Sequence, residues 1–449
     1  MRDYTGLPVV VAGAGTSGTA AARVLRELGA RVTVVDASPS ALAVMADQGF
    51  ATGTALPAEV AEVVTSPGWP PSSALLMDAA GRGVEVLGEV ELAWRLRGER
   101  PAPWLAVTGT NGKTTTVKML EGVLRADGRR VVAAGNVGLP LLDAVLDPQP
   151  YDVLAVELSS FQLHWSSTLR PRTGALLNVA DDHTDWHGSF QAYATDKAKV
   201  LQAGTSIANA DDEVSRTLLS RAPGRRVSFT LRVPRSGELG VVEDLLVDRA
   251  FPDVHGEGTE LASLDELPVP GRHNVANALA AAAMARSYGV SAASVRQGLR
   301  GFAPEPHRNA LVRVVDGVSW VDDSKATNPH AAAAALAAYR SVVWVAGGLL
   351  KGADVEDLVQ RAAPRLRAVV LLGTDRAALV DALSRHAPDV PVVEVARLDT
   401  GAMPAAVAAA RSLAEPGDTV LLAPAAASMD CFRDYRQRGE LFAVEVAAL

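Results

Sequence analysis

The sequence of 449 residues has little of what several classes of protein require. Cys431 is its single cysteine, so an intrachain disulfide and a cysteine-clustered metal site are both excluded. Aromatic residues make up 5% of the chain, which disfavours a surface that stacks nucleic-acid bases. Acidic residues outnumber basic ones, 51 against 43, and the net charge of −8 disfavours broad binding to a phosphate backbone. The net charge does not exclude a local basic pocket.

Long apolar runs are also missing, since none approaches the ~18–20 residues of a membrane-spanning helix. Leu7–Gly15 has the length of a signal-peptide core, but its glycines and the amphipathic segment after it fit a nucleotide-binding turn better. At ~150 residues per domain the length suggests about three domains. We therefore expect a cytoplasmic, multidomain protein that is not inserted in a membrane.

Short apolar runs alternate with helical periodicity along the chain, which predicts mainly parallel sheets covered by helices. The expected fold is α/β with three domains: Rossmann-like over residues 1–98, P-loop-type mononucleotide-binding over 99–303, and Rossmann-like again over 304–449. Segments 97–103 and 301–306 are the predicted linkers, and 249–271 is expected to be irregular. The predicted strands are Val9–Ala12, Arg31–Val35, Val60–Val64, Trp104–Val107, Val131–Ala134, Val153–Val156, Ala175–Val179, Val318–Val321, Val342–Ala346, Val369–Leu372, Val392–Val395 and Thr419–Leu422.

Gly13–Gly18 matches G-x-G-x-x-G between a predicted strand and a predicted helix. Glycine permits the tight turn and lets a phosphate approach the helix N-terminus. Asp36 follows the next strand, where an acid can bind a ribose hydroxyl. Three interpretations stay open: a dinucleotide dehydrogenase, a cradle for another nucleotide diphosphate, and a turn that binds nothing.

Thr108–Thr115 is a more specific motif, with Gly-Lys-Thr between a strand and a helix. Such a turn offers backbone N–H groups and the Lys113 ammonium to a triphosphate, and the Thr114 hydroxyl to Mg²⁺. Val107 stands where the first glycine of a standard P-loop falls. Glu157 ends a nearby strand and is well placed to hold Mg²⁺, the alternative being a solvated strand-end glutamate.

The region around residue 183 contains two histidines, His183 and His187, spaced four apart as in a zinc pair. The helix-borne H-E-x-x-H pattern is absent, so a single histidine supporting Mg²⁺ or phosphate is favoured. Lys197 by itself is typical of a solvated surface residue. Asn274 and Asn277 share a helix face suited to adenine or phosphate, with N-capping by Asn274 as the alternative.

The last domain has polar groups after three of its strands, at 322–328, 347–351 and 424–430. Ligands of open α/β folds bind at the carboxyl ends of strands, so a common cleft is favoured over helix caps. Arg308 follows the second linker, where it is positioned to reach a γ-phosphate unless it is an ordinary surface arginine.

Together these motifs resemble those of the Mur ligases, and among them the members that add D-glutamate. The matching stretches are Thr108–Thr115, Glu157–Leu163, Asn178–His183, Gly271–Asn277, Asp323–Asn328 and Ala423–Gly439. Asp323–Asn328 discriminates best, because sister ligases that add alanine or a diamino acid carry other sequences there. Asn309-Ala310 stands where family members often have an aromatic residue and an acid, and Tyr435 stands where phenylalanine is usual.

The resemblance implies ATP-dependent amide synthesis in cytoplasmic peptidoglycan assembly. The carboxylate of UDP-N-acetylmuramoyl-L-alanine would attack the γ-phosphate of ATP, giving an acyl phosphate and ADP. The amine of D-glutamate would then attack, and the tetrahedral intermediate would expel phosphate. ATP and two Mg²⁺ ions are implied, and we expect a monomer with no nucleic-acid partner.

The resemblance also implies roles for individual residues. The catalytic ones would be Lys113, His183 and Lys197, and the metal ligands Thr114, Glu157, His183 and Lys197 carboxylated to a carbamate. ATP would be bound by Gly109, Thr110, Asn111, Gly112, Lys113, Thr114, Thr115, His273, Asn274, Asn277, Arg308 and Asp323. The two other substrates would be bound by Gly15, Thr16, Ser17, Asp36, Ser66, Gly68, Asn136, Ser159, Gln162, Lys325, Thr327, Lys351, Ser428 and Tyr435.

Other functions remain in competition. A different Mur ligase or a folylpolyglutamate synthase is disfavoured by the N-terminal glycine turn and by residues 323–328. An NAD-dependent dehydrogenase explains Gly13–Gly18 but leaves Lys113 and Glu157 without a role. A non-catalytic nucleotide-binding module makes the predicted metal ligands superfluous.

Overall fold

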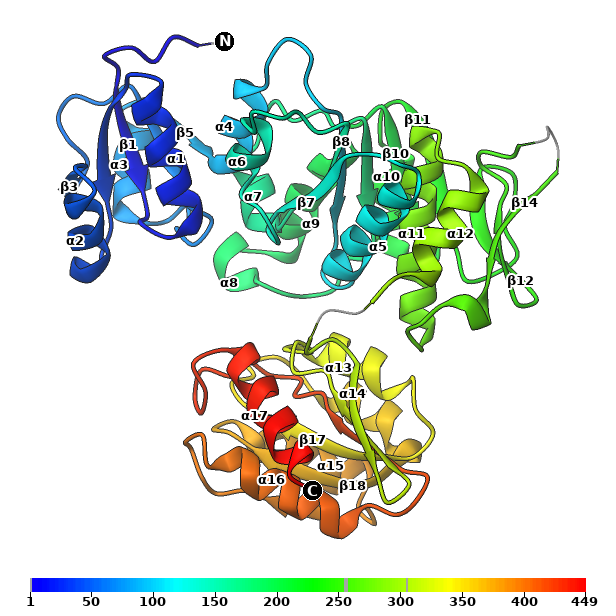
Figure 1. Ribbon diagram of the computed structural model, residues 1–449. Helices are drawn as coiled ribbons and strands as arrows, with labels where there is room; N and C mark the ends of the chain where they lie inside the picture. The colour runs from blue at the N-terminus through cyan, green and yellow to red at the C-terminus, as the bar shows by residue number, and fades with distance from the viewer. Residues whose placement is uncertain (1, 254–256, 304–305) are drawn as a thin grey trace. The chain divides into compact units, whose positions relative to one another are not determined.

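The computed structural model describes residues 2–253, 257–303 and 306–449 (Figure 1). The chain divides into two compact units, the first comprising residues 1–268 and 275–302 and the second residues 269–274 and 303–449. The predicted domain start at residue 304 and the middle of the predicted linker 301–306 lie outside the described residues. Among the described residues no helix is long and apolar enough to cross a membrane.

The first sheet has five parallel strands in the order β3-β2-β1-β4-β5, the arrangement of a Rossmann-like fold. The strands are β1 Pro8–Ala12, β2 Arg31–Val35, β3 Ala51–Gly53, β4 Glu62–Thr65 and β5 Glu85–Gly88. The helices are α1 Thr16–Glu27, α2 Pro39–Asp47, α3 Ala74–Gly81 and α4 Glu89–Leu96. The small buried side chains of α1, Ala20–Ala22, let this helix lie close to the sheet.

The second sheet has nine strands in the order β14-β13-β12-β11-β10-β9-β6-β8-β7. They are β6 Trp104–Thr108, β7 Val131–Gly135, β8 Val153–Glu157, β9 Thr173–Leu176, β10 Thr205–Asn209, β11 Arg225–Phe229, β12 Glu238–Val242, β13 Leu245–Asp248 and β14 Thr259–Ser263. The pairs from β7 to β12 are parallel, whereas β12, β13 and β14 pair antiparallel. The prediction that 249–271 is irregular is wrong at β14, because pairing with β13 orders a segment with no clear periodicity of its own.

The helices that accompany this sheet are α5 Lys113–Ala126, α6 Leu141–Val145, α7 Ser160–His164, α8 Thr184–His187, α9 Phe190–Ala198, α10 Glu213–Ser220, α11 Arg272–Tyr288 and α12 Ala292–Arg300, with short 3₁₀ turns at Lys199–Leu201 and Leu264–Glu266. Residues 278–285 of α11 are fully buried, which explains its alanine content. Gly298 of α12 packs on α5 so closely that a Cβ there would lie 2.3 Å from the Val123 Cα. These contacts build one layered unit around β6 and the loop that follows it.

The third sheet has the order β15-β16-β20-β17-β18-β19 and is parallel except for the hairpin β15–β16. Its strands are β15 Ala310–Val315, β16 Val318–Asp322, β17 Val342–Gly347, β18 Leu366–Leu372, β19 Val392–Glu394 and β20 Thr419–Leu422. Its helices are α13 Pro329–Leu336, α14 Glu356–Ala362, α15 Arg376–His386, α16 Ala402–Leu413 and α17 Tyr435–Ala447, with a 3₁₀ turn at Ala363–Arg365.

Helices cover both faces of the third sheet. In β17, Val342 and Trp344 pack with α13, α14 and α15, while Val343 and Val345 pack with α16 and α17 on the other face. A strand buried on both faces needs an uninterrupted apolar sequence, which is why these strands were predictable. The three-sheet α/β fold agrees with the expectation of mainly parallel sheets, with antiparallel pairs at β12–β13, β13–β14 and β15–β16.

Candidate active site

The loop between β6 and α5 is fixed by a second segment of the same unit. The Thr110 N–H donates to the Asn178 carbonyl at 2.9 Å, and the Asn111 N–H donates to the Asn178 side-chain oxygen at 2.9 Å. The Thr110 Oγ1 accepts a hydrogen bond from the Ala180 N–H at 3.0 Å and lies 2.9 Å from the Tyr193 hydroxyl. The loop that the sequence assigns to phosphate binding is therefore held in shape before any ligand arrives.

Two lysines meet at this loop. Lys113 donates from Nζ to the Gly109 and Thr110 carbonyls, each at 2.9 Å, and Lys197 donates from Nζ to the Gly109 carbonyl at 2.7 Å. Lys197 is only 2% exposed, so its description as a solvated surface residue is wrong. Burial, together with the charge of Lys113, lowers the pKa of Lys197 well below its ordinary value.

Glu157 stands beside the start of α5 at the end of β8. Its Oε2 accepts a hydrogen bond from the Thr114 hydroxyl at 2.7 Å, and its Oε1 accepts one from the Asn136 side chain at 2.7 Å. Glu157 is 1% exposed, which contradicts the alternative of a solvated strand-end glutamate. A buried carboxylate held by a hydroxyl and an amide presents hard oxygen donors, the type that Mg²⁺ prefers.

The two histidines spaced four apart, His183 and His187, have different surroundings. His183 has a φ of 53° and an exposed side chain, with its ring 4.7 Å from that of Phe161. His187 is held at both ring nitrogens, Nδ1 lying 3.0 Å from Asp196 Oδ2 and Nε2 lying 3.0 Å from Ser160 Oγ. His164 Nδ1 lies 2.8 Å from the same Asp196 oxygen.

These three groups, His164, His187 and Asp196, bring possible metal-ligand atoms within 4.8 Å of one another in the part of the chain that the structure describes. Each is already hydrogen-bonded, and Lys199 places its ammonium 3.0 Å from the other Asp196 oxygen. A neighbouring cation disfavours a metal ion there, so the cluster is an internal polar network.

The start of α11 places one predicted ligand group directly on the loop. A Cβ on Gly112 would lie 2.3 Å from Asn277 Oδ1, and Gly112 has a φ of +84°, which glycine adopts without strain. Asn277 Oδ1 also accepts a hydrogen bond from Thr116 Oγ1 at 3.3 Å. His273 and Asn274 fall within the first turn of the helix, and since α11 begins at Arg272 the N-capping alternative for Asn274 is wrong.

Two predicted substrate-binding residues, Ser159 and Gln162, form a capping box at the start of α7. The Ser159 Oγ accepts from the Gln162 N–H at 3.2 Å, and the Ser159 N–H donates to the Gln162 side-chain oxygen at 2.9 Å. This arrangement gives both residues a structural role at the helix terminus. It also fixes the helix α7, whose N-cap Ser159 lies two residues after Glu157.

The glycine turn of the first sheet surrounds a serine hydroxyl. A Cβ on Gly13 would lie 2.5 Å from Ser66 Oγ, and this buried hydroxyl has no hydrogen-bond partner among the described residues. Asp36 accepts from the Ala14 and Ser38 N–H groups at 2.7 and 2.8 Å, so it holds the turn. Gly15 is the N-cap of α1 and is followed by Thr16 and Ser17, and Gly68 has open space around it.

Three loops of the second unit meet at the carboxyl ends of β16, β20 and β17, as expected from their polar residues. The Ala425 N–H donates to the Ala326 carbonyl at 2.9 Å, and Leu349 and Ala427 exchange backbone hydrogen bonds of 2.8 and 2.9 Å. The predicted ligand groups on these loops are Asp323, Lys325, Thr327, Lys351 and Ser428. Their convergence follows from strand order, because β16, β20 and β17 are adjacent and parallel.

Several of these predicted ligand side chains already contact other residues of the same unit. The Lys325 ammonium lies over the Tyr435 ring, 3.9 Å from its centre, and Tyr435 begins α17. Asp323 accepts from the Asn309 N–H at 3.0 Å, and burial raises its pKa to about 8 against the opposing effects of that N–H and of Arg308. Lys351 has a φ of +54°.

Sequence reasoning left out Tyr193, whose hydroxyl contacts Thr110. Tyr193 is 1% exposed and precedes Lys197 by four residues on α9. That i,i+4 spacing places the two side chains on one helix face, a signal that was available in the sequence. The sequence marks Asn178 only as part of a matching stretch, whereas in the structure it accepts hydrogen bonds from the Thr110 and Asn111 N–H groups.

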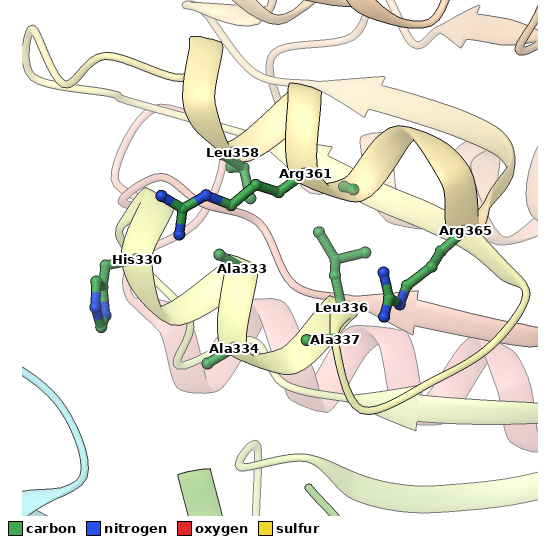
Figure 2. A pocket seen from close by; sticks show the side chains of 9 residues that line it. His330, Ala333, Ala334, Leu336, Ala337, Leu358, Arg361 and Arg365 are labelled. Carbon is green, nitrogen blue, oxygen red and sulfur yellow. The ribbon is translucent and has the colours of Figure 1, made fainter. Parts of the chain in front are cut away.

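Three cavities in the described residues lie away from the loop residues 109–115. Figure 2 shows one of about 410 Å³ between α13 and α14, with alanines and Leu336 inside and the Arg361 and Arg365 side chains at its rim. The other two, of about 630 and 610 Å³, belong to the first unit.

Comparison with family models gives three matches. The Mur ligase middle domain matches residues 107–285, and the Mur ligase glutamate ligase domain matches residues 307–426. A pyridine nucleotide-disulphide oxidoreductase model matches residues 8–56, which agrees with the Rossmann-like order of the first sheet.

Curated relatives align along the whole chain. A UDP-N-acetylmuramoylalanine–D-glutamate ligase from Thermobifida fusca is 59% identical, with 100% of this chain and 99% of that protein covered. Proteins of the same name from Streptomyces avermitilis and Mycolicibacterium smegmatis are 54% and 50% identical, covering 100% and 99% of this chain and 100% and 97% of those proteins.

Two solved structures share the fold at 18% sequence identity. A pseudomurein peptide ligase type C from Methanothermus fervidus gives a TM-score of 0.61 and covers 98% of this chain and 100% of its own. A UDP-N-acetylmuramate–alanine ligase from Thermotoga maritima gives a TM-score of 0.58 and covers 98% and 99%.

Proposed function

Because the chain belongs to the Mur ligase family, we propose that it uses ATP to join D-glutamate to UDP-N-acetylmuramoyl-L-alanine. The product would be a peptidoglycan precursor, formed through an acyl phosphate with release of ADP and phosphate. The single observation that carries this function is the full-length similarity, at 50–59% identity, to ligases of that name. The geometry of the loop after β6 supports the ATP-dependent half of the reaction.

The chemical task is to bring two anions together, the substrate carboxylate and the γ-phosphate. The Gly109 and Gly112 N–H groups and the Lys113 ammonium would hold the phosphates and offset their charge, while the Thr110 and Asn111 N–H groups stay bonded to Asn178. Lys113 now donates to two carbonyls of its own loop, so phosphate binding exchanges these neutral acceptors for charged ones. Thr115, Asn274 and Asn277 complete the proposed ATP site in the first unit and at the start of α11.

Mg²⁺ is part of this proposal, and the Thr114–Glu157 pair fits it by the chemistry of its oxygen donors. Thr114, Glu157 and His183 would hold the metal, which supplies charge neutralisation at the phosphates when bound. Lys197 as an amine donates hydrogen bonds and does not fit a cation. It fits only after carboxylation to a carbamate, and its lowered pKa favours the neutral amine that adds to CO₂.

D-glutamate would be bound by the converging loops of the second unit, through Lys325, Thr327, Lys351, Ser428 and Tyr435. Two ammonium groups in that set match the two carboxylates of the amino acid. In the same unit Arg308 and Asp323 are proposed to contact ATP. The Lys325–Tyr435 contact would orient one of these ammonium groups.

The UDP-bearing substrate would be bound by the glycine turn of the first sheet. The unpartnered Ser66 hydroxyl and the open space at Gly68 support this assignment. Asn136, Ser159 and Gln162 would contact the sugar-peptide part of the substrate. With each sheet assigned one ligand, we also propose the three-domain division 1–98, 99–303 and 304–449, a monomer, and a cytoplasmic location.

The test is phosphate release from ATP with Mg²⁺ and UDP-N-acetylmuramoyl-L-alanine, measured with a panel of amino acids. Release that depends on D-glutamate and on the UDP substrate together is the expected result. Equal release with L-alanine or a diamino acid would instead assign the chain to another branch of the family. Hydride transfer to or from NAD in place of phosphate release would support the dehydrogenase alternative.

A further inference from the structure

A cavity of about 610 Å³ lies at the edge of the second sheet opposite to the phosphate-binding loop. Trp104, the first residue of β6, lines it, whereas the loop begins at Gly109 after the last residue of that strand. At about 3.3 Å per residue, the strand separates the two places by roughly 15 Å. Arg172 precedes β9 and Thr205 begins β10, so the lining comes from the amino ends of three adjacent parallel strands.

Three arginines line this cavity, Arg97, Arg170 and Arg172, and no carboxylate does. In the described parts of the chain none of the three forms an ion pair with an acidic side chain, although the protein has more acidic than basic residues. The cavity in Figure 2 is different, because its rim residue Arg361 pairs with Asp357. Clustered arginines without carboxylates create a local positive field that favours an anion.

The guanidinium groups are partly oriented already. Arg97 lies over the Trp94 ring, 3.0 Å from its centre, and donates from Nε to the Trp94 carbonyl at 2.8 Å. Burial lowers the pKa of Arg97 to about 10, a cost that a bound anion would offset. Arg170 donates to the Leu169 carbonyl at 2.7 Å.

A purely structural role accounts for only part of this arrangement. The carbonyl ends of α4 and α11 lie near the cavity, and cations stabilise such ends. This effect explains the hydrogen bond from Arg97 to the Trp94 carbonyl at the end of α4. A guanidinium has five N–H donors, however, and Arg172 makes no side-chain hydrogen bond within the described residues, its group lying 5.7 Å from the centre of the Tyr288 ring.

An adjoining cavity of about 630 Å³ shares Arg170 and adds Lys199, whose ammonium is already paired with Asp196. Arginine forks bind phosphate oxygens in pairs, and three of them match a ligand with two or more negative charges.

We propose that the cavity lined by Arg97, Arg170 and Arg172 is a second anion site, separate from the phosphate-binding loop, for a small molecule that carries a diphosphate group. The ligand would bridge the chain after α4 to the amino edge of the second sheet. This site goes beyond the proposed ligase reaction, since none of its residues belongs to the assigned substrate or metal sets.

The test is a calorimetric titration of the full-length protein with pyrophosphate. The wild type is compared with R97Q/R172Q and with R100Q, a matched control in the same linker whose exposed side chain does not line the cavity. We expect the wild type and R100Q to bind one more equivalent of pyrophosphate than R97Q/R172Q does. If the double variant still binds that equivalent, we expect its affinity to be about tenfold lower. The additional equivalent should persist in K113A, which perturbs the loop only.

Equal stoichiometry and affinity for pyrophosphate in the wild type and R97Q/R172Q would overturn the proposal. A loss of pyrophosphate binding in R100Q as large as that in R97Q/R172Q would also overturn it. If the double variant does not fold, R172Q alone serves, because Arg172 makes no hydrogen bond within the described residues that its loss would break. A parallel titration with ADP identifies the source of the diphosphate. Tighter binding of ADP than of pyrophosphate at this site indicates a nucleotide, and equal or weaker binding indicates a simpler phosphate compound.

Discussion

Lys113 and Lys197 donate from their Nζ atoms to the same backbone oxygen, that of Gly109, at 2.9 and 2.7 Å. Two ammonium groups on one acceptor repel each other, and the more buried one is more easily held neutral. Lys197 is that residue, since burial and Lys113 both lower its pKa. The lowered pKa of Lys197 fits the proposed carboxylation, which needs a neutral amine.

Replacing Lys197 with alanine should lower kcat by about 10²-fold or more, because the proposed carbamate is lost. Added acetate should restore part of the activity by supplying a carboxylate in the space that the side chain leaves. Phosphate release with and without acetate is the measurement. Lys118→Ala is the control, since Lys118 pairs with Glu121 on α5; full activity of Lys197→Ala would remove the role assigned to that lysine.

Glu157→Gln keeps the shape of the side chain and removes its charge. We expect kcat to fall by about 10²-fold and the Mg²⁺ concentration for half-maximal activity to rise, because one hard anionic donor is lost. Glu121→Gln is the matched control, a buried glutamate of the same unit that pairs with Lys118 and Arg125. Unchanged Mg²⁺ dependence in Glu157→Gln would argue against a metal at this carboxylate.

Gly112→Ala and Gly128→Ala separate backbone strain from crowding. Both glycines have positive φ, +84° and +78°, so each alanine costs roughly 1–2 kcal/mol. Only at Gly112 would the new Cβ meet another group, the Asn277 side-chain oxygen. Gly128→Ala should lower Tm but retain ATP binding, whereas Gly112→Ala should also lose ATP binding, as followed by calorimetry; equal behaviour of the two would contradict the structure of the loop.

Glu89 and Glu91, two residues apart on α4, should change stability with pH in opposite directions. Burial raises the pKa of Glu89 to about 7, against the N–H groups of Leu142 and Leu141. The folded state therefore holds this proton more tightly than the unfolded state, and stability falls as pH rises from about 4.5 to 7. Glu89→Gln should remove this slope. Between about pH 4.5 and 7 the free energy of unfolding of the variant should therefore rise by about 3 kcal/mol relative to that of the wild type.

Glu91 is the internal control for that experiment. Burial raises its pKa, but hydrogen bonds from Thr168 and Arg95 outweigh burial and leave the pKa below its ordinary value. Its stabilisation is present above the ordinary pKa and is lost as pH falls through the lowered one. Glu91→Gln should be destabilised at neutral pH and approach the wild type in acid, below the ordinary pKa. Urea unfolding from pH 8 down to about pH 3 measures both variants, and parallel curves would refute the assignment.

The sequence by itself determined most features that depend on neighbouring residues. The apolar run of Val342–Ala346 predicted a strand buried on both faces, and Gly-Lys-Thr between a strand and a helix predicted the loop in which Gly112 has positive φ. These signals are local, because strand and helix periods and turn residues act within a few positions. The motifs after three strands of the last domain also converge as expected, since parallel strand ends share one edge.

Tertiary structure decided the burial and the hydrogen bonds that arise between segments far apart in the sequence. Nothing near Lys197 in the sequence shows that it is buried against Gly109, or that Asp196 joins His164 to His187. The antiparallel pairing of β14 and the grouping of arginines around Trp104 also depend on contacts that the local sequence does not reveal. Burial, hydrogen bonding and pKa depend on packing between segments far apart in the chain, and that packing is a property of the whole fold.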